Sequence, residues 1–266
     1  MSTTRTALVT GATSGIGYAV ARELADRGYR VIGTGRNTST GVGHADGVEY
    51  VDLDLTFPNS VERCAAAVGD IDILVNNAGE SQCGPLEELP QEELQRIFQL
   101  NVFGPVHLTQ LLLPGMRARG YGRVVMVGSM LASFPVAFRS SYVASKAAIK
   151  GFATSARAEV EPYGVKITTV EPGAIDTGIS TRRNHCITPD SVYRNEYRTV
   201  IGKLDANEAV GISAPRVART VVAAIEAENP KPLYAVGSRA PLAFALKRVA
   251  PDAVMEKIVL RQHDIH

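Results

Sequence analysis

The chain has 266 residues, of which 45% are hydrophobic and 21% charged, so it can bury a sizeable core and lacks the composition of a disordered or collagen-like protein. Its 28 Lys and Arg residues nearly balance its 27 Asp and Glu residues, and this net charge of +1 excludes the basic surface that nucleic acid requires. The three cysteines and five histidines have neither disulfide-framework nor metal-ligand spacing. Without a signal-peptide pattern or a membrane-spanning stretch, the sequence predicts a soluble cytoplasmic protein that binds no metal.

Apolar strands and amphipathic helices alternate along the chain. Hydrophobic patterning predicts strands at residues 6–10, 30–34, 48–53, 71–75, 123–127, 165–170 and 233–236. It predicts helices at residues 15–27, about 91–113, 141–161 and 214–228. Such strands pair in parallel through right-handed crossovers, with helices on both faces of the sheet. We therefore expect one α/β domain over residues 1–266, built on a doubly wound parallel sheet of about seven strands.

A glycine-rich turn joins the first predicted strand to the first predicted helix. It reads Thr10-Gly11-Ala12-Thr13-Ser14-Gly15-Ile16-Gly17. Glycines permit a tight turn and close approach to a pyrophosphate, and the helix N-terminus offers unpaired N–H groups and a partial positive charge. The turn in this context predicts a nucleotide-binding site.

The end of the second strand predicts which kind of nucleotide is bound. An acid at this place would hydrogen-bond a bare ribose and repel a 2′-phosphate. Here Gly35 occupies the place and Arg36 follows it, which favours a dinucleotide with a 2′-phosphate. The alternative for Arg36 is a solvated loop arginine.

Polar residues also follow the third and fourth strands, at the edge where open α/β sheets bind ligands. Asp54, which precedes Leu55, could accept a hydrogen bond from an adenine amino group or could be an ordinary loop acid. The run Asn76-Asn77-Ala78-Gly79 could line the ligand crevice or form an ordinary turn.

Tyr142 and Lys146 are the sharpest catalytic candidates. Their spacing places the phenol and the ammonium on one helix face, where the cation should lower the pKa of Tyr142 and prepare it to exchange a proton with an alcohol or ketone. A Tyr-x-x-x-Lys pair occurs by chance often enough that this pair alone is weak evidence for a catalytic site. Ser129 ends the preceding strand and could hydrogen-bond a substrate oxygen, and Asn101 lies inside the long predicted helix; each alone is more often structural.

In combination these motifs indicate one protein family. The ordered set Thr-Gly-x-x-x-Gly-x-Gly, Asn-Asn-Ala-Gly, Asn101, Ser129, Tyr-x-x-x-Lys and Glu171-Pro172-Gly173 resembles the short-chain dehydrogenase/reductase family over nearly the whole chain. The resemblance implies a single-domain Rossmann fold. It also implies that Tyr142 is the catalytic acid/base and that Lys146 lowers the pKa of Tyr142 and binds the nicotinamide ribose. By the same resemblance, Ser129 orients the substrate oxygen and Asn101 holds a water in a proton relay.

The same resemblance implies a nicotinamide cofactor, with NADP(H) favoured over NAD(H). The positions that match cofactor-binding residues are Gly11, Thr13, Ser14, Gly15, Ile16, Gly17, Arg36, Asp54, Leu55, Asn77, Ala78, Gly79, Tyr142, Lys146, Pro172, Gly173 and Thr177. Ser14 stands where many NADP-dependent members have a basic residue, so the phosphate preference depends mainly on Arg36. The residues after Glu171 are weakly similar to the branch of 17β-hydroxysteroid and retinol dehydrogenases.

Two segments do not follow the alternating pattern of strands and helices. Residues 178–212 are expected to form a substrate lid, and the Arg and Tyr residues between 182 and 198 are expected to be solvated rather than to meet an acidic substrate. Residues 238–266 form a C-terminal extension, for which core or subunit packing is favoured over a membrane-surface contact. The Ala-rich helix at 141–161 and the family resemblance predict a homodimer or homotetramer.

The sequence thus predicts an NADP(H)-dependent oxidoreductase that transfers a hydride between nicotinamide and a small secondary alcohol or ketone, for instance a steroid-, retinoid- or lipid-like one. Two alternatives stay open. One is an NADP(H)-binding sensor or scaffold without turnover, which would be favoured if the catalytic residues were replaced. The other is a dehydratase or epimerase, which would have a larger C-terminal substrate domain than this chain can supply.

Overall fold

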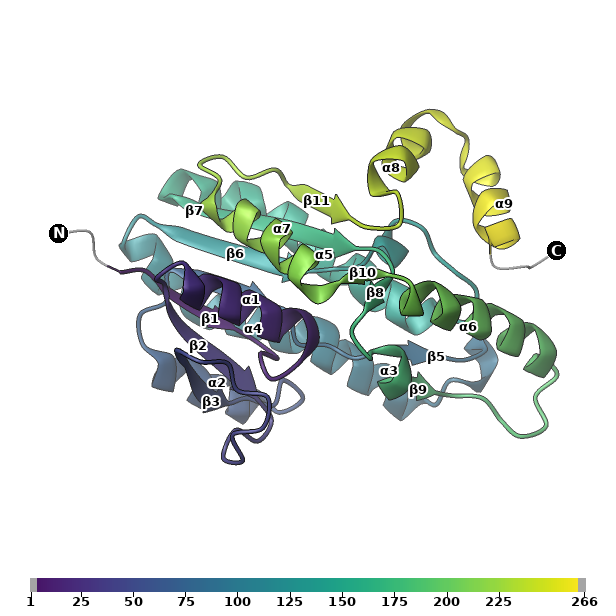
Figure 1. The fold of residues 1–266 in the computed structure, drawn as a ribbon, viewed down its shortest axis with the longest axis horizontal. Helices are drawn as coiled ribbons and strands as arrows, with labels where there is room; N and C mark the ends of the chain where they lie inside the picture. The colour runs from purple at the N-terminus through teal and green to yellow at the C-terminus, as the bar shows by residue number, and fades with distance from the viewer. Residues whose placement is uncertain (1–3, 263–266) are drawn as a thin grey trace.

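A central parallel sheet organises residues 4–262, the part of the chain that the computed structural model describes (Figure 1). Its strands run in the order β11-β7-β6-β4-β1-β2-β3, and every neighbouring pair is parallel. Their bounds are β1 Thr6–Val9, β2 Arg30–Gly35, β3 Val48–Asp52, β4 Ile73–Asn76, β6 Gly122–Val127, β7 Val165–Pro172 and β11 Leu233–Val236. The doubly wound sheet predicted from the sequence is confirmed. The ends of the predicted domain, residues 1–3 and 263–266, lie outside the described residues.

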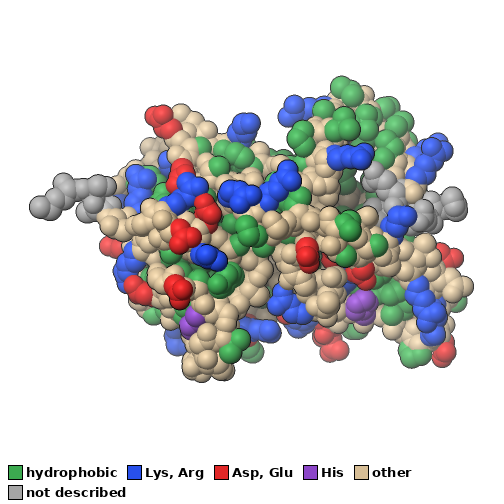
Figure 2. Space-filling model, in the orientation of Figure 1, with side chains coloured by type: hydrophobic (Ala, Val, Ile, Leu, Met, Phe, Trp, Pro, Cys, Tyr) green, Lys and Arg blue, Asp and Glu red, His purple; other side chains and the backbone are tan. Residues whose placement is uncertain are grey.

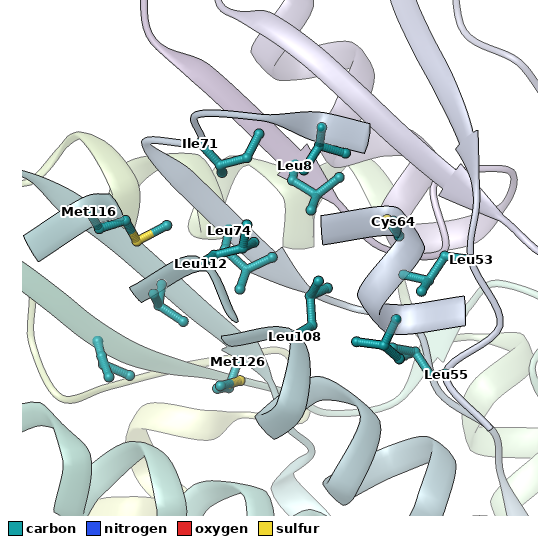
Figure 3. Packing of buried hydrophobic residues seen from close by; sticks show 14 of the residues in the cluster. Leu8, Leu53, Leu55, Cys64, Ile71, Leu74, Leu108, Leu112, Met116 and Met126 are labelled. Atoms are coloured by element: carbon teal, nitrogen blue, oxygen red, sulfur yellow. The ribbon is translucent and has the colours of Figure 1, made fainter. Parts of the chain in front are cut away.

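Helices cover both faces of this sheet. On one face α1 (Gly15–Asp26) packs against α7 (Ala214–Glu226). On the other face lie α2 (Pro58–Val68), α4 (Gly104–Ala118) and α5 (Ser140–Val160). The alternation of side chains along a strand explains why both faces need cover: Ala7 and Val9 belong to the core beneath α1 and α7, while Leu8 belongs to the core on the opposite face. Figure 3 shows Leu8 among the buried side chains of that second core.

The long helix predicted at residues 91–113 is interrupted. The structure has α3 (Gln91–Phe98), a π-helical turn (Gln99–Phe103) and then α4. The physical reason is Pro105, which has no N–H to donate to the carbonyl of Asn101 four residues earlier. The widened turn places Asn101 in the buried interior, and π-turns of this kind are frequent at functional sites.

Shorter elements extend beyond the carboxyl ends of the strands. Two small parallel pairs are formed by β5 (Gln82–Cys83) with β9 (Asn184–His185) and by β8 (Ile175–Asp176) with β10 (Ile212–Ser213). Helix α6 (Arg194–Ala209) lies between β9 and β10 in the sequence. Single turns of 3₁₀-helix occur at η1 Leu86–Glu88, η3 Met130–Ala132, η4 Glu161–Tyr163 and η5 Ser180–Arg182.

The C-terminal extension forms two helices, α8 (Ala240–Val249) and α9 (Asp252–Gln262), at the right of Figure 1. Phe244 packs edge-on against Phe134 at a ring distance of 5.1 Å, which joins α8 to the loop after β6. Leu242 and Val249 are exposed, and Figure 2 shows hydrophobic side chains gathered over these two helices. Within residues 4–262 no helix has the length and apolar character to cross a membrane.

Candidate active site

The glycine-rich turn between β1 and α1 has the backbone that the sequence predicts. Gly11 and Gly15 have φ angles of +65° and +56°, a region that favours glycine. A Cβ atom on Gly17 would lie 2.2 Å from the carbonyl oxygen of Gly11 and 2.4 Å from Nδ2 of Asn77. The turn is therefore so tight that only glycine fits at these positions. Without side chains there, the backbone N–H groups at the N-terminus of α1 stay accessible, and such groups can bind the pyrophosphate of a dinucleotide.

Asn77 supports this turn from the end of β4. Its Nδ2 donates to the carbonyl oxygen of Thr10 at 2.9 Å, and its backbone N–H donates to Oγ1 of Thr10 at the same distance. The N–H of Ala78 also donates to that hydroxyl, at 3.0 Å. The structure thus brings Asn77 and Ala78 to the glycine turn, where Asn77 acts by bracing the backbone.

The residues after β2 and β3 lie at the same edge of the sheet. Arg36 is exposed and has no hydrogen bond or ion pair with the other described residues. Gly35 is buried, and a Cβ atom there would lie 2.8 Å from Cγ2 of Thr13. Asp54 accepts hydrogen bonds at Oδ1 from the N–H and the hydroxyl of Thr56, at 2.9 and 2.6 Å, so this oxygen is already used in a local turn.

Tyr142 and Lys146 lie one turn apart on α5, and both side chains are buried. The ammonium of Lys146 donates to the carbonyl oxygen of Val127 at 3.0 Å and lies 5.9 Å from the centre of the Tyr142 ring. A Cβ atom on Gly79 would lie only 3.5 Å from that ammonium. Because Gly79 continues the segment that braces the glycine turn, the predicted catalytic helix and the predicted nucleotide site adjoin.

Ser129 completes this arrangement. It follows β6, and its Oγ accepts a hydrogen bond from the N–H of Leu131 at 3.2 Å. The same side chain lowers the pKa of Tyr142, so Ser129 lies close to the Tyr142 side chain. Two hydroxyl groups from different elements therefore meet at one place, beside Lys146, where a carbonyl or alcohol oxygen could be bound between them.

The pKa of Tyr142 differs from the expectation that Lys146 lowers it. Burial raises the pKa of Tyr142, and this effect outweighs the opposing influences of the Arg139 cation and of Ser129. Burial also lowers the pKa of Lys146 to about 8. The pKa of Tyr142 was not predictable from the sequence, because the depth of its burial and the approach of Arg139 are tertiary features.

Asn101 is held by hydrogen bonds to the protein. Its Nδ2 donates to the carbonyl oxygen of Glu80 at 3.0 Å and to Oγ of Ser145 at 3.1 Å. Its Oδ1 accepts from the N–H of Glu80 at 2.9 Å. Its side chain therefore ties the catalytic helix to the segment after β4, and its part in a proton relay stays a prediction.

The segment after β7 lies over the glycine turn. A Cβ atom on Gly15 would be 3.5 Å from the Cβ atom of Thr177. Arg182 reaches back across the turn, and its Nη1 donates to Oγ of Ser14 at 3.3 Å. At the start of the segment, Gly173 has no room for a side chain, because a Cβ atom would lie 2.2 Å from Oγ of Ser238.

Two of the Arg and Tyr residues between 182 and 198 are buried, so the prediction that these side chains are solvated is wrong for them. Arg183 forms ion pairs with Asp205 at 2.6 Å and with Glu208 at 2.9 Å, both on α6. Tyr197 lies in an apolar cluster of the same helix. The partners of Arg183 lie on a helix that the sequence analysis did not identify, which is why its burial was missed.

Arg139 is a further residue that the sequence analysis missed. It directly precedes α5, it is only 2% exposed, and its guanidinium carbon lies 4.5 Å from the centre of the Tyr142 ring. The signal in the sequence is its position three residues before the tyrosine, a spacing that brings side chains together on a helix. Among residues 4–262 no group of three or more His, Cys, Asp and Glu side chains is placed to hold a metal ion.

Comparison with known proteins decides the family. Residues 5–187 match the family model described as short chain dehydrogenase, which is more than half of the chain. The chain belongs to the short-chain dehydrogenase family. It is 33% identical to retinol dehydrogenase 8 of Bos taurus, over 93% of this chain and 86% of the relative. Short-chain dehydrogenases bind nicotinamide cofactors and act on small molecules.

Two solved structures resemble this short-chain dehydrogenase over almost its full length. A crystal structure of a short-chain dehydrogenase from Streptomyces avermitilis has a TM-score of 0.82 and 33% sequence identity, covering 98% of this chain and 99% of that one. A short chain dehydrogenase from Burkholderia cenocepacia, solved in complex with NADP, has a TM-score of 0.77 and 28% identity, covering 97% and 98%.

Proposed function

We propose that this short-chain dehydrogenase transfers a hydride between NADP(H) and a secondary alcohol or ketone. The observation that supports this most strongly is the placement of Ser129 close to the Tyr142 side chain, with Lys146 one helical turn away. The adjoining glycine turn has the shape and the unpaired N–H groups that a dinucleotide requires. Residues 1–266 then form a single catalytic domain.

The protein's part in the reaction is to handle the proton and to orient the groups. A bound nicotinamide supplies or accepts the hydride at its C4 atom. In the direction of ketone reduction, the Tyr142 hydroxyl donates its proton to the carbonyl oxygen as the carbonyl carbon gains the hydride, so a neutral alcohol leaves. Ser129 donates a hydrogen bond to the same oxygen and stabilises the negative charge that develops there. In alcohol oxidation the proton returns to the Tyr142 oxygen.

The cofactor proposed is NADP(H). With Gly35 in place of an acid, β2 itself ends without a carboxylate that would repel a 2′-phosphate, and the exposed guanidinium of Arg36 is free to bind it. The Burkholderia cenocepacia structure, solved with NADP, is consistent with this choice. Asp54, Leu55, Pro172 and Gly173 stay proposed cofactor contacts.

The substrate proposed is apolar, of the steroid, retinoid or lipid type. A pocket of about 390 Å³ opens at the start of the catalytic helix. Its walls are Gly84, Pro85, Leu86, Glu87, Phe138, Ser140 and Tyr193. Most of this lining is apolar, and the similarity to a protein named retinol dehydrogenase agrees with it. Residues 178–212, which contribute Tyr193 to the wall, would act as the substrate lid.

The test is a panel of ketones and alcohols, offered with NADPH, NADH, NADP and NAD, in which the absorbance of the reduced nicotinamide is followed. Turnover of an apolar ketone or alcohol, with NADPH or NADP preferred, is the expected result. Tight cofactor binding without turnover of any compound in the panel would instead favour a sensor or scaffold.

A further inference from the structure

Arg139 is the cation nearest to the Tyr142 ring among the charged residues of this site. Its guanidinium carbon lies 4.5 Å from the ring centre, whereas the ammonium of Lys146 lies 5.9 Å away. The side chain is buried, so neither water nor salt screens its charge effectively. A cation over the face of an aromatic ring is attracted to the ring, and the attraction increases when the ring carries negative charge.

The charge of Arg139 has no carboxylate partner within residues 4–262. Its Nη2 donates to Oγ of Ser81 at 2.9 Å, while its Nε and Nη1 are buried and make no hydrogen bond. The neighbouring Arg183, which also reaches Ser81, takes both nearby carboxylates, Asp205 and Glu208. A buried cation without a counter-ion is unfavourable, and any nearby group that can become an anion is stabilised by it.

We propose that Arg139 is a positioning residue that acts through Tyr142: its guanidinium, stacked over the ring, stabilises the phenolate that remains after Tyr142 gives up its proton. The catalytic consequence depends on the proposed function, since the phenolate is the form that accepts a proton from an alcohol. When the O–H bond of Tyr142 ionises, the proton leaves to the substrate or to water. The electron pair stays on the phenol oxygen and ring, facing the cation.

The other charged groups around Tyr142 do not replace Arg139. Arg183 and Glu208 face it from the lid, but they pair with each other, so their opposite influences on the pKa of Tyr142 offset one another. Lys146 is farther away, and burial lowers its pKa to about 8, which reduces its charge as the solution becomes alkaline. Burial raises the pKa of the Cys83 thiol, so that group is neutral. Burial lowers the pKa of Arg139 as well, but a guanidinium starts from a much higher pKa than an ammonium and stays protonated in proteins.

The test is a direct titration of Tyr142 in the full chain. The ultraviolet absorbance of phenolate is followed from about pH 6 to about pH 11, and the curve of a matched Tyr142→Phe variant is subtracted, which isolates this one of the nine tyrosines. The comparison is made in the native background and with Arg139→Met, Arg139→Lys and Ser81→Ala. Ser81→Ala is the control, because it removes the hydrogen bond of Arg139 and keeps its charge.

Because burial raises the pKa of Tyr142 above its ordinary value of 10, the native protein should release this proton only near the alkaline end of the range. Arg139→Met should raise the midpoint by one pH unit or more, or move it out of range, whereas Ser81→Ala should leave it within about 0.3 unit and Arg139→Lys should fall between. Arg139→Gln replaces the Met variant if circular dichroism shows that the latter is unfolded.

An unchanged midpoint in the neutral variant, or no release by Tyr142 in the native protein, would overturn the inference. The titration needs neither cofactor nor substrate, so it is independent of the proposed function. If no alcohol or ketone were turned over, the proposed function would fail while this result could still hold. If Tyr142→Phe abolished turnover but Arg139→Met left the midpoint unchanged, only the inference on Arg139 would fail.

Discussion

At the scale of single residues, the proposed preference for NADP(H) rests on two neighbours at the end of β2. Gly35 occupies the position where an acid would repel a 2′-phosphate, and Arg36 offers a planar guanidinium that can bind this phosphate. Both were evident in the sequence, because the preference follows from residue type at a known place in the strand–turn–helix pattern. The contact of Gly35 with Thr13 was not evident, because it depends on how the glycine turn folds back onto β2.

Arg36→Ala should weaken NADPH binding far more than NADH binding. Hydrogen bonds to charged groups contribute about 1.5–3 kcal/mol, so the loss for NADPH should be roughly 10- to 150-fold. Adding Gly35→Asp should reverse the preference, provided that the methyl group of Thr13, 2.8 Å from the new Cβ atom, rotates away. Fluorescence titration of the purified variants with both reduced cofactors measures this. Equal or tighter NADH binding by the native protein would mean that Arg36 is only a solvated loop residue.

The buried ammonium of Lys146 should make stability depend on pH in a specific window. Burial lowers the pKa of Lys146 from 10.5 to about 8, so between these values the unfolded chain binds a proton that the folded chain does not. The free energy of unfolding should therefore rise with pH across this window, relative to Lys146→Met, by about 3 kcal/mol. Urea denaturation of both proteins at pH values across the window checks this. A difference between the two proteins that stays constant with pH would contradict a lowered pKa.

At the scale of elements, the segment after β7 connects the proposed lid to the proposed cofactor site. Arg182 hydrogen-bonds Ser14 across the glycine turn, and Thr177 lies beside Gly15. A cation held at the place where the pyrophosphate is proposed to bind can contact that pyrophosphate, which NADPH and NADH share. This segment should therefore contribute to binding both cofactors without selecting between them.

Arg182→Ala should weaken NADPH and NADH to the same extent, roughly fivefold to tenfold, because the side chain is exposed and solvent screens its charge. The matched control is Arg198→Ala, an exposed arginine on α6, which should leave both affinities unchanged. Calorimetric titration of the three proteins with each cofactor provides the comparison. A loss confined to NADPH would indicate that Arg182 binds the 2′-phosphate instead.

The sequence predicted the sheet better than the helices outside it. Strands buried on both faces are continuous apolar runs, so β1, β2, β6 and β11 were placed within a residue or so of their observed bounds. The prediction missed α2 and α6, since their polar surfaces weaken the apolar periodicity. It also treated α3 and α4 as one helix, because periodicity does not register the missing N–H of Pro105. The candidate catalytic residues could be proposed from the sequence because their types and spacing carry the chemistry, whereas the burial of Arg139 and Arg183 depends on packing between distant segments.

At the scale of the whole molecule, the predicted homodimer or homotetramer has a candidate surface on α5. Phe152 is 46% exposed on this Ala-rich helix, and Phe103, before α4, is 52% exposed. Large apolar side chains exposed on a helix with small residues are typical of subunit interfaces, because small residues permit close approach of two backbones.

Phe152→Glu should therefore shift the protein towards the mass of a single chain, because a buried carboxylate opposes association. Light scattering at micromolar concentration would measure the shift against the native protein. Val192→Glu is the matched control, since Val192 is 82% exposed in the lid and its replacement should leave the mass unchanged. A native protein that is already monomeric would contradict the predicted assembly.

Tyr142 is the group proposed to exchange a proton with the substrate. The most direct measurement compares turnover of the best ketone or alcohol from the panel by the native protein and by Tyr142→Phe, together with NADPH affinity. The variant keeps the buried ring but loses the hydroxyl, so turnover should fall by about 100-fold or more while NADPH binding is retained. Near-native turnover by Tyr142→Phe, under conditions where the chemical step limits the rate, would contradict the account.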